Sequence, residues 1–177
     1  MKKKTLALVL ALTLLVAGIV GGTLAWLTDQ TAEVKNTFTV GDINIGLTET
    51  TADYKMVPGN TIAKDPTVTV KANSEACWLF VQITESADLK DFITYAIAEG
   101  WTALPGVDGV YYREVPASAA DQTFSVLAGD AVTVKSDVTR TMLETAKTDA
   151  PTLTFQAYAI QKDHFATADA AWAEVSK

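Results

Sequence analysis

The sequence predicts an all-β fold, a β-sandwich of Greek-key or jelly-roll type with short peripheral helices, one of them at the C-terminus. About nine short segments alternate apolar and polar residues with a period of two, as half-buried strands do. Residues that favour turns separate these segments, and only three pieces have helical character. Short strands joined by such turns are typical of antiparallel sandwiches.

The first predicted strand is NTFTVGDINIGLTET, residues 36–50, in which the apolar phase slips at Gly41–Asp42 and indicates a bulge. The residues VPGN, 57–60, predict a turn. In PTVTVKAN, residues 66–73, the valines share one face and the threonines the other, which predicts a half-buried strand. CWLFVQITE, residues 77–85, is the most apolar run and predicts a central strand covered on both faces.

The remaining strands follow the same pattern, with turns at Glu99–Gly100 and Gly129–Asp130. They are expected within residues 92–104, 107–115, 122–138 and 152–162. The three helical pieces are residues 87–93, 136–147 and 167–177. Ser136 or Asp137 is the expected N-cap of the second piece.

The N-terminus has the layout of a secretory signal. Residues 1–4 carry the positive charge, residues 5–20 form an apolar run, and a glycine pair with small residues leads to a predicted cut between Ala25 and Trp26. The alternative is an uncleaved anchor, because the uncharged stretch is long enough to span a bilayer. We therefore expect a signal peptide at 1–25, an N-terminal segment at 26–35 and a β-sandwich domain at 36–177.

Composition narrows the function. The chain of 177 residues has a formal net charge of −7, and without the three lysines of the signal the balance of 11 basic against 21 acidic residues is −10. An acidic body argues against nucleic acid as a partner, since phosphates need positive partners. Contact with a membrane is expected only through the signal before cleavage. Cys77 is the only cysteine, so no internal disulfide forms, and its apolar surroundings predict a buried thiol.

The sequence offers no catalytic or cofactor motif. His164 is the only histidine and lies in a polar stretch, so neither a His-rich zinc site nor a triad is expected. Residues 106–109, GVDG, could hold at most a weak surface ion. Trp101, Tyr111 and Tyr112 could form a platform for sugars, although strand aromatics are more often core. We expect no enzyme, no cofactor and no resident metal.

Several segments, in order and spacing, resemble the TasA/camelysin (CalY) family of exported matrix proteins. They are GGTLAWLTD, NTFTVGDINIGLTE, MVPGNTIAKDPTVTVKANSEACWLFVQI, DGVYYRE and FQAYAIQKDHFATADAAWAEV. The resemblance covers nearly the whole chain. It implies a jelly-roll sandwich whose signal is removed by a SipW-type signal peptidase. Some camelysin relatives are described as metalloproteases, but this sequence has no histidine pair for that activity.

The resemblance also implies assembly into extracellular fibres of a biofilm matrix or cell surface. In TasA-like fibres the segment after the cut completes the sheet of a neighbouring subunit, and here that segment is residues 26–35. Trp26, Leu27 and Val34 are its apolar anchor candidates. The expected partners are other copies of the chain, the signal peptidase and further matrix or anchor proteins. The alternatives are a monomeric, adhesin-like surface binding module and, ranked lowest, an exported hydrolase.

Overall fold

The computed structural model describes residues 42–50 and 54–177, together with Lys3. The chain divides into two compact units, Met1–Thr39 and Val40–Lys177, and the fold described below is that of the second. Its described residues form ten strands: β1 (Ile45–Thr48), β2 (Thr61–Ala63), β3 (Thr67–Val70), β4 (Cys77–Glu85), β5 (Ile93–Thr94), β6 (Thr102–Ala103), β7 (Val110–Val115), β8 (Gln122–Ser125), β9 (Ala131–Val134) and β10 (Leu153–Gln161). The helices are short: α2 (Leu89–Phe92), η1 (Ala128–Asp130), α3 (Arg140–Ala146), η2 (Lys162–His164) and α4 (Ala168–Val175).

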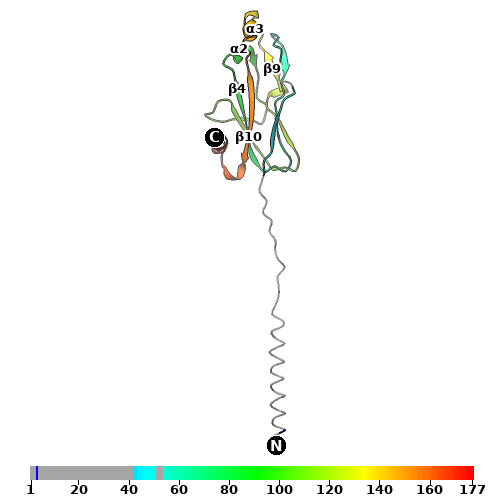
Figure 1. Cartoon of the computed structure of the whole chain (residues 1–177), viewed down its shortest axis with the longest axis vertical. Helices are drawn as coiled ribbons and strands as arrows, with labels where there is room; N and C mark the ends of the chain where they lie inside the picture. Colours follow the sequence, from blue (N-terminus) through cyan, green and yellow to red (C-terminus); the bar gives the residue numbers. More distant parts are fainter. Residues whose placement is uncertain (1–2, 4–41, 51–53) are drawn as a thin grey trace. The chain divides into compact units, whose positions relative to one another are not determined.

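The strands form three antiparallel sheets, in the orders β1-β3-β8, β2-β9-β5 and β10-β4-β7-β6. In the last of these, β4 and β10 run side by side along the domain (Figure 1). The expected all-β class with short helices, including a C-terminal one, is thereby confirmed.

The two three-stranded sheets continue into each other. β2 leads into β3, and β8 leads through η1 into β9, so two strands of each sheet come from the same two stretches of chain. Residues 126–130 oppose the shorter segment 64–66 at the junction, which makes a bulge. The backbone there is left-handed, with φ of 66° at Gly129 and 49° at Asp130. The predicted Gly-Asp turn is therefore the bend between two sheets.

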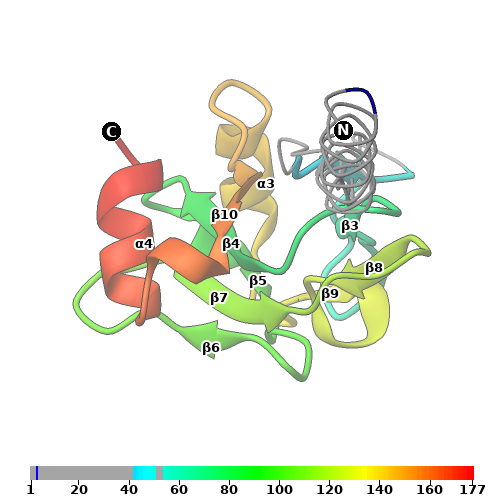
Figure 2. The same cartoon turned by 90° about the horizontal axis from the view of Figure 1, so that it is seen from below.

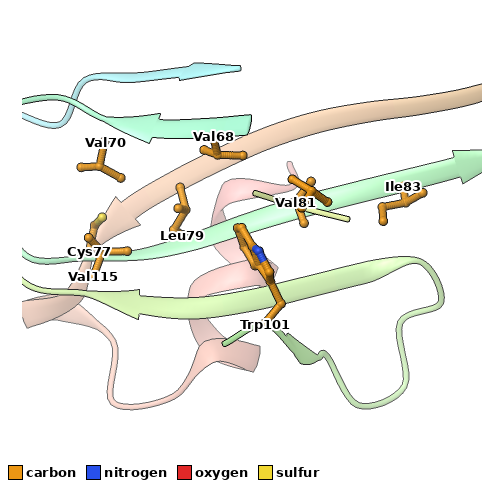
Figure 3. Close-up of a cluster of buried hydrophobic side chains, with 9 residues drawn as sticks. Val68, Val70, Cys77, Leu79, Val81, Ile83, Trp101 and Val115 are labelled. Carbon is orange, nitrogen blue, oxygen red and sulfur yellow. The ribbon is translucent and has the colours of Figure 1, made fainter. Parts of the chain in front are cut away.

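The first core cluster lies between the four-stranded sheet and the β1-β3-β8 sheet (Figure 3). Val68 and Val70 of β3 meet Leu79 and Val81 of β4, and each of these side chains is at most 1% exposed. The predicted half-buried strand is confirmed, because the threonines between these valines are only partly buried. Cys77 is fully buried in the same cluster, as its apolar surroundings predicted.

The opposite face of the four-stranded sheet is covered by α4 (Figure 2). The centre of the Trp172 ring lies 5.3 Å from the ring centres of both Phe80 and Tyr158. β4 is thus buried on both faces, since Leu79 belongs to the first cluster and Phe80 to this one. The prediction of a central, doubly covered strand is confirmed.

A second cluster fills the end of the domain under the β2-β9-β5 sheet. Leu89 and Phe92 of α2 pack there with Val132 and Val134 of β9 and with Ala146 of α3. In the part of the chain that the structure describes, no helix is long and apolar enough to cross a membrane.

One expectation about elements is wrong, and two others are confirmed only in part. Ser136 and Asp137 do not cap α3, because Val138 turns into the second core cluster and the helix begins only after Thr139. The Thr139 side chain accepts a hydrogen bond from Met142 N at 3.3 Å instead. Residues 92–104 form only the two-residue strands β5 and β6 around the expected turn, which has φ of 87° at Gly100. In the first predicted strand, residues 45–48 are strand, and the phase slip at Gly41 lies outside the described residues.

Candidate functional site

β10 has one edge that no described strand pairs. Its nine residues are in antiparallel register with β4, from Leu153 opposite Glu85 to Gln161 opposite Cys77. β10 is nevertheless an end strand of its sheet, so within residues 42–50 and 54–177 no strand adds to its other side. Its sequence, LTFQAYAIQ, has none of the charges or prolines that commonly protect such edges. A long open edge can accept a further strand through backbone hydrogen bonds.

The hydrogen bonds at the two ends of β10 show which residues carry the open edge. Ser86 N donates to Thr152 O and Lys162 N donates to Ala76 O, both at 2.9 Å. Because bonded and non-bonded pairs alternate in an antiparallel ladder, the even-numbered residues of β10 bond β4. The odd-numbered residues therefore direct their N–H and C=O groups outward: Leu153, Phe155, Ala157, Ala159 and Gln161.

β1 presents a second open edge beside β10. Among the described strands β1 pairs only with β3, and Lys71 N donates to Asn44 O at 2.8 Å. By the same alternation, the backbone groups of Ile43, Ile45 and Leu47 face away from β3. β1 and β10 contact each other, and the apolar side chains of both pack on the first core cluster.

Two cavities lie at the beginning of β10 and one, largely open to solvent, lies at its end; together we call them the β10 groove. The first, about 450 Å³, lies at residues 150–154; the second, about 300 Å³, at residues 153–155; the third, about 390 Å³, at residues 159–161. Residues from other elements complete each lining. The first cavity is also lined by Met56, Ile62, Leu89, Ile93 and Val132. The second is also lined by Leu47, Glu49 and Pro66, and the third by Ile43, His164 and Phe165.

A partly buried ion pair lies where the first cavity meets the second. Lys64 is 7% exposed, and its Nζ is 2.6 Å from Glu49 Oε1. The Tyr54 hydroxyl donates to the same oxygen at 2.8 Å, and the Lys64 ammonium lies 4.6 Å from the centre of the Tyr54 ring. Burial, with the bond to the Glu49 carboxylate, raises the pKa of Tyr54, so its hydroxyl keeps the proton. These contacts hold the chain that follows β1 against the groove.

The other side of the two layers, where β6 and β8 are the end strands, is filled by side chains. Trp101 is 9% exposed, and its Nε1 donates to Ser125 O at 2.9 Å, which ties one layer to the other. The Arg113 guanidinium lies 3.9 Å from the centre of the Phe124 ring and 5.4 Å from that of Trp101. The two sides of the sandwich therefore differ, because the β1–β10 side holds the groove and the β6–β8 side is packed.

The aromatic residues proposed as a sugar platform do not share a surface. Trp101 and Tyr111 pack with the first core cluster, whereas Tyr112 packs on the opposite face of the sheet. Tyr112 and Trp78 make an edge contact with ring centres 5.9 Å apart. This alternative site is wrong, because adjacent residues of a strand point to opposite faces.

The predicted cleavage and donor residues lie outside the described residues: Ala25, Trp26, Leu27 and Val34. They stay predictions. Of the remaining candidates, His164 is exposed in η2. Burial raises the pKa of the Cys77 thiol to about 11, so the thiol is protonated and inert at neutral pH.

The described residues thus define a two-layered antiparallel β protein in which the long open edge of β10 lies beside a groove. A family model described as camelysin metallo-endopeptidase matches residues 1–77. The resemblance to the camelysin (TasA/CalY) family is therefore confirmed over those residues, and proteins of this family are exported. A search of the curated proteins and a search of the solved structures each found no match.

The family's description implies a bound metal, and the residues present do not fit one. The whole sequence has one histidine, whereas protease zinc sites of the HExxH kind need two on one helix. His164 stands exposed on η2, and the described residues contain no cluster of three His, Cys, Asp or Glu side chains.

Sequence reasoning found β10 but not the groove beside it. The alternation in residues 152–162 predicts a strand, yet an end strand and a central strand can share that pattern. The Lys64–Glu49 pair was also missed, because no local signal shows that a lysine before β3 meets a glutamate after β1. One signal was available: the segment LTFQAYAIQ is long, mostly apolar and uncharged.

Proposed function

We propose that this protein is an exported structural subunit that assembles into extracellular fibres of a biofilm matrix or cell surface. The N-terminal segment of one copy, residues 26–35, adds as a strand along β10 of the next copy, whose domain is a jelly-roll sandwich. The observation that carries this proposal is the open nine-residue edge of β10 beside its groove. The family match over residues 1–77 supports export.

An assembly built on this contact has a direction, because donor and acceptor are different surfaces of the subunit. The donor is the N-terminal segment and the acceptor is the β10 edge, so each subunit gives one surface and receives on another. Heterologous contacts of this kind form filaments when the rotation between copies does not close a ring. Cleavage between Ala25 and Trp26 by a SipW-type signal peptidase frees the segment. Other matrix or anchor proteins are further partners.

Electron microscopy of the purified chain 26–177, beside a control that starts at Asn36, tests the proposal. We expect filaments from the first protein after concentration and none from the second. Equal, monodisperse particles from both would contradict it and favour the monomeric surface module. Circular dichroism of both proteins shows whether the shortened control keeps its β structure.

A further inference from the structure

The segment 26–35 has a polarity pattern that fits the groove. Its charged residues, Asp29, Glu33 and Lys35, all have odd numbers, whereas the even-numbered residues are uncharged. In an extended strand, side chains of odd and even residues point to opposite faces. A strand made of this segment therefore has one charged face and one uncharged face, and the uncharged face begins with Trp26 and ends with Val34.

The spacing of the two apolar ends matches the spacing of the cavities. Trp26 and Val34 are eight residues apart, as are Leu153 in the first cavity and Gln161 in the third. Both intervals span roughly 27 Å, since a strand rises about 3.3 Å per residue. One straight strand beside β10 can therefore place both apolar ends in cavities at once.

We propose a register for this strand: residues 26–34 of a second copy run parallel to β10, with Trp26 beside Leu153 and Val34 beside Gln161. This inference rests on the proposed function and adds the orientation and the anchor sites. Trp26 enters the first cavity, the largest of the three at about 450 Å³, between Leu89 and Ile93. Val34 enters the third cavity, against Ile43 and Phe165.

The residues between the anchors also suit their neighbours in this register. Thr28 and Gln30 come beside Phe155 and Ala157, near the Lys64–Glu49 pair, whose charged groups can hydrogen-bond to hydroxyl and amide groups. Ala32 comes beside Ala159, which leaves room for close approach of the strands. The outward N–H and C=O groups of β10 supply the ladder, and the three charges of the segment stay in water.

Cysteine cross-linking tests the register in the chain 26–177 with Cys77→Ala as background. One protein carries Ala159→Cys, and the protein mixed with it carries either Ala32→Cys or Thr28→Cys. In the proposed register residue 32 of the donor lies beside residue 159 of the acceptor, whereas in the reversed strand residue 28 does. Neither substitution removes an apolar anchor, so both mixtures should still form filaments.

We expect oxidation to give about tenfold more cross-linked dimer from the 32–159 mixture than from the 28–159 mixture, because cysteines with Cα atoms beyond about 7 Å do not bridge. Dimer chiefly from the 28–159 mixture would overturn the register. Filaments without dimer from either mixture would also overturn it and leave the proposed function standing. Absence of filaments would instead overturn the proposed function. A protein that carries both Ala32→Cys and Ala159→Cys distinguishes contacts within one chain from contacts between copies. Cross-links only within one chain would show that each segment lies in its own groove, and would overturn both the register and the proposed function.

Discussion

At the scale of single residues, Gly109 shows how closely two backbones can approach. Its φ is 73°, and a Cβ on it would lie 2.4 Å from Ile83 O. Ile83 N donates to Gly109 O at 2.8 Å, so separating the two backbones would break that bond. Gly106 has a similar φ of 75°, but nothing lies within 4 Å of a Cβ added there. Comparing substitutions at the two glycines therefore distinguishes the cost of steric overlap from the cost of a left-handed backbone.

We expect Gly106→Ala to lower the free energy of unfolding by about 1 kcal/mol, the cost of placing a side chain in the left-handed region. Gly109→Ala should cost about 3 kcal/mol or more, because overlap with the Ile83 carbonyl adds to that strain. Urea denaturation of dilute chain 26–177 measures both. Equal decreases in the free energy of unfolding for the two variants would show that the close contact with Ile83 does not contribute to the cost of the Gly109→Ala substitution.

The buried thiol of Cys77 makes the stability of the fold depend on pH. The folded protein holds the thiol pKa at about 11, whereas a free cysteine titrates near about 8.5. Between these values the unfolded chain binds fewer protons than the folded chain, so stability falls as pH rises. The contribution of the buried neutral thiol is fully present below the unfolded pKa and is lost as pH rises through the folded pKa.

From this shift we expect the free energy of unfolding of the wild type to fall by up to about 3 kcal/mol more than that of Cys77→Ala between roughly pH 8.5 and 11. The raised pKa of Tyr95, caused chiefly by burial and by its bond to Glu85, affects both proteins alike. Urea denaturation at several pH values compares the two slopes. Parallel slopes would rule out the thiol as their source.

At the scale of elements, the start of α3 depends on one side chain. Thr139 accepts a hydrogen bond from Met142 N, and Arg140–Ala146 follow as helix. We expect Thr139→Ala to cost about 1 kcal/mol of stability, since an N-cap satisfies a backbone donor that otherwise has no partner in the helix. Asp137→Ala, at the position first expected to cap, should change stability by less than about 0.5 kcal/mol. Chemical denaturation of both variants decides which residue begins the helix.

Proline scanning along β10 tests its open edge directly. Ala157 directs its N–H away from β4, whereas the neighbouring Gln156 directs its own N–H toward β4. Proline has no N–H and is tolerated in strands only where that group faces solvent. Ala157→Pro should keep the monomer's circular dichroism but stop filament growth, because the added strand loses a donor and meets the proline ring.

Gln156→Pro is the matched control. It removes a bond inside the sheet, so we expect it to destabilise the monomer by about 3 kcal/mol or more. Filaments from Ala157→Pro at the wild-type rate would exclude this edge as the assembly surface. A folded Gln156→Pro monomer of unchanged stability would show that the assigned direction of the hydrogen bonds is wrong.

Local sequence patterns predicted where strands form, but not which strands lie side by side. Val68, Val70 and the residues around Leu79 have the alternation or apolarity that burial requires, so β3 and β4 follow from the sequence. The alternation in residues 92–104 is similar, yet only β5 and β6 form there, because strand length depends on which partner lies alongside. The β10 groove could not be predicted, since it arises where β1 and β10, about a hundred residues apart, end two different sheets.

At the scale of the whole domain, the two sides of the sandwich are packed differently. Trp101 and Arg113 pack the β6–β8 side, where the Trp101 indole bonds Ser125 of the other layer. The β1–β10 side has the nine-residue open edge of β10 and the cavities beside it. If the proposed strand adds only along β10, each domain accepts one strand, which favours a linear chain of subunits over a branched assembly.

If the groove is completed by residues 26–35, the free peptide WLTDQTAEVK should bind the chain 36–177 and stabilise it. A ligand at a concentration a hundredfold above its Kd adds about 2.7 kcal/mol, since it binds only the folded state. For a domain of this size that raises Tm by roughly 8 °C. Calorimetry of the chain with and without peptide measures the shift.

Two altered peptides show whether the strand inserts with its uncharged face inward. Ala32→Asp places a charge on the face that enters the groove, so this peptide should give no shift, because burying an unpaired carboxylate costs several kcal/mol. Thr31→Asp places the same charge one residue away, on the face expected in water, and should keep most of the shift. Equal shifts from the two peptides would mean that alternation does not govern binding. A shift from neither WLTDQTAEVK nor Thr31→Asp would mean that this segment does not complete the sheet.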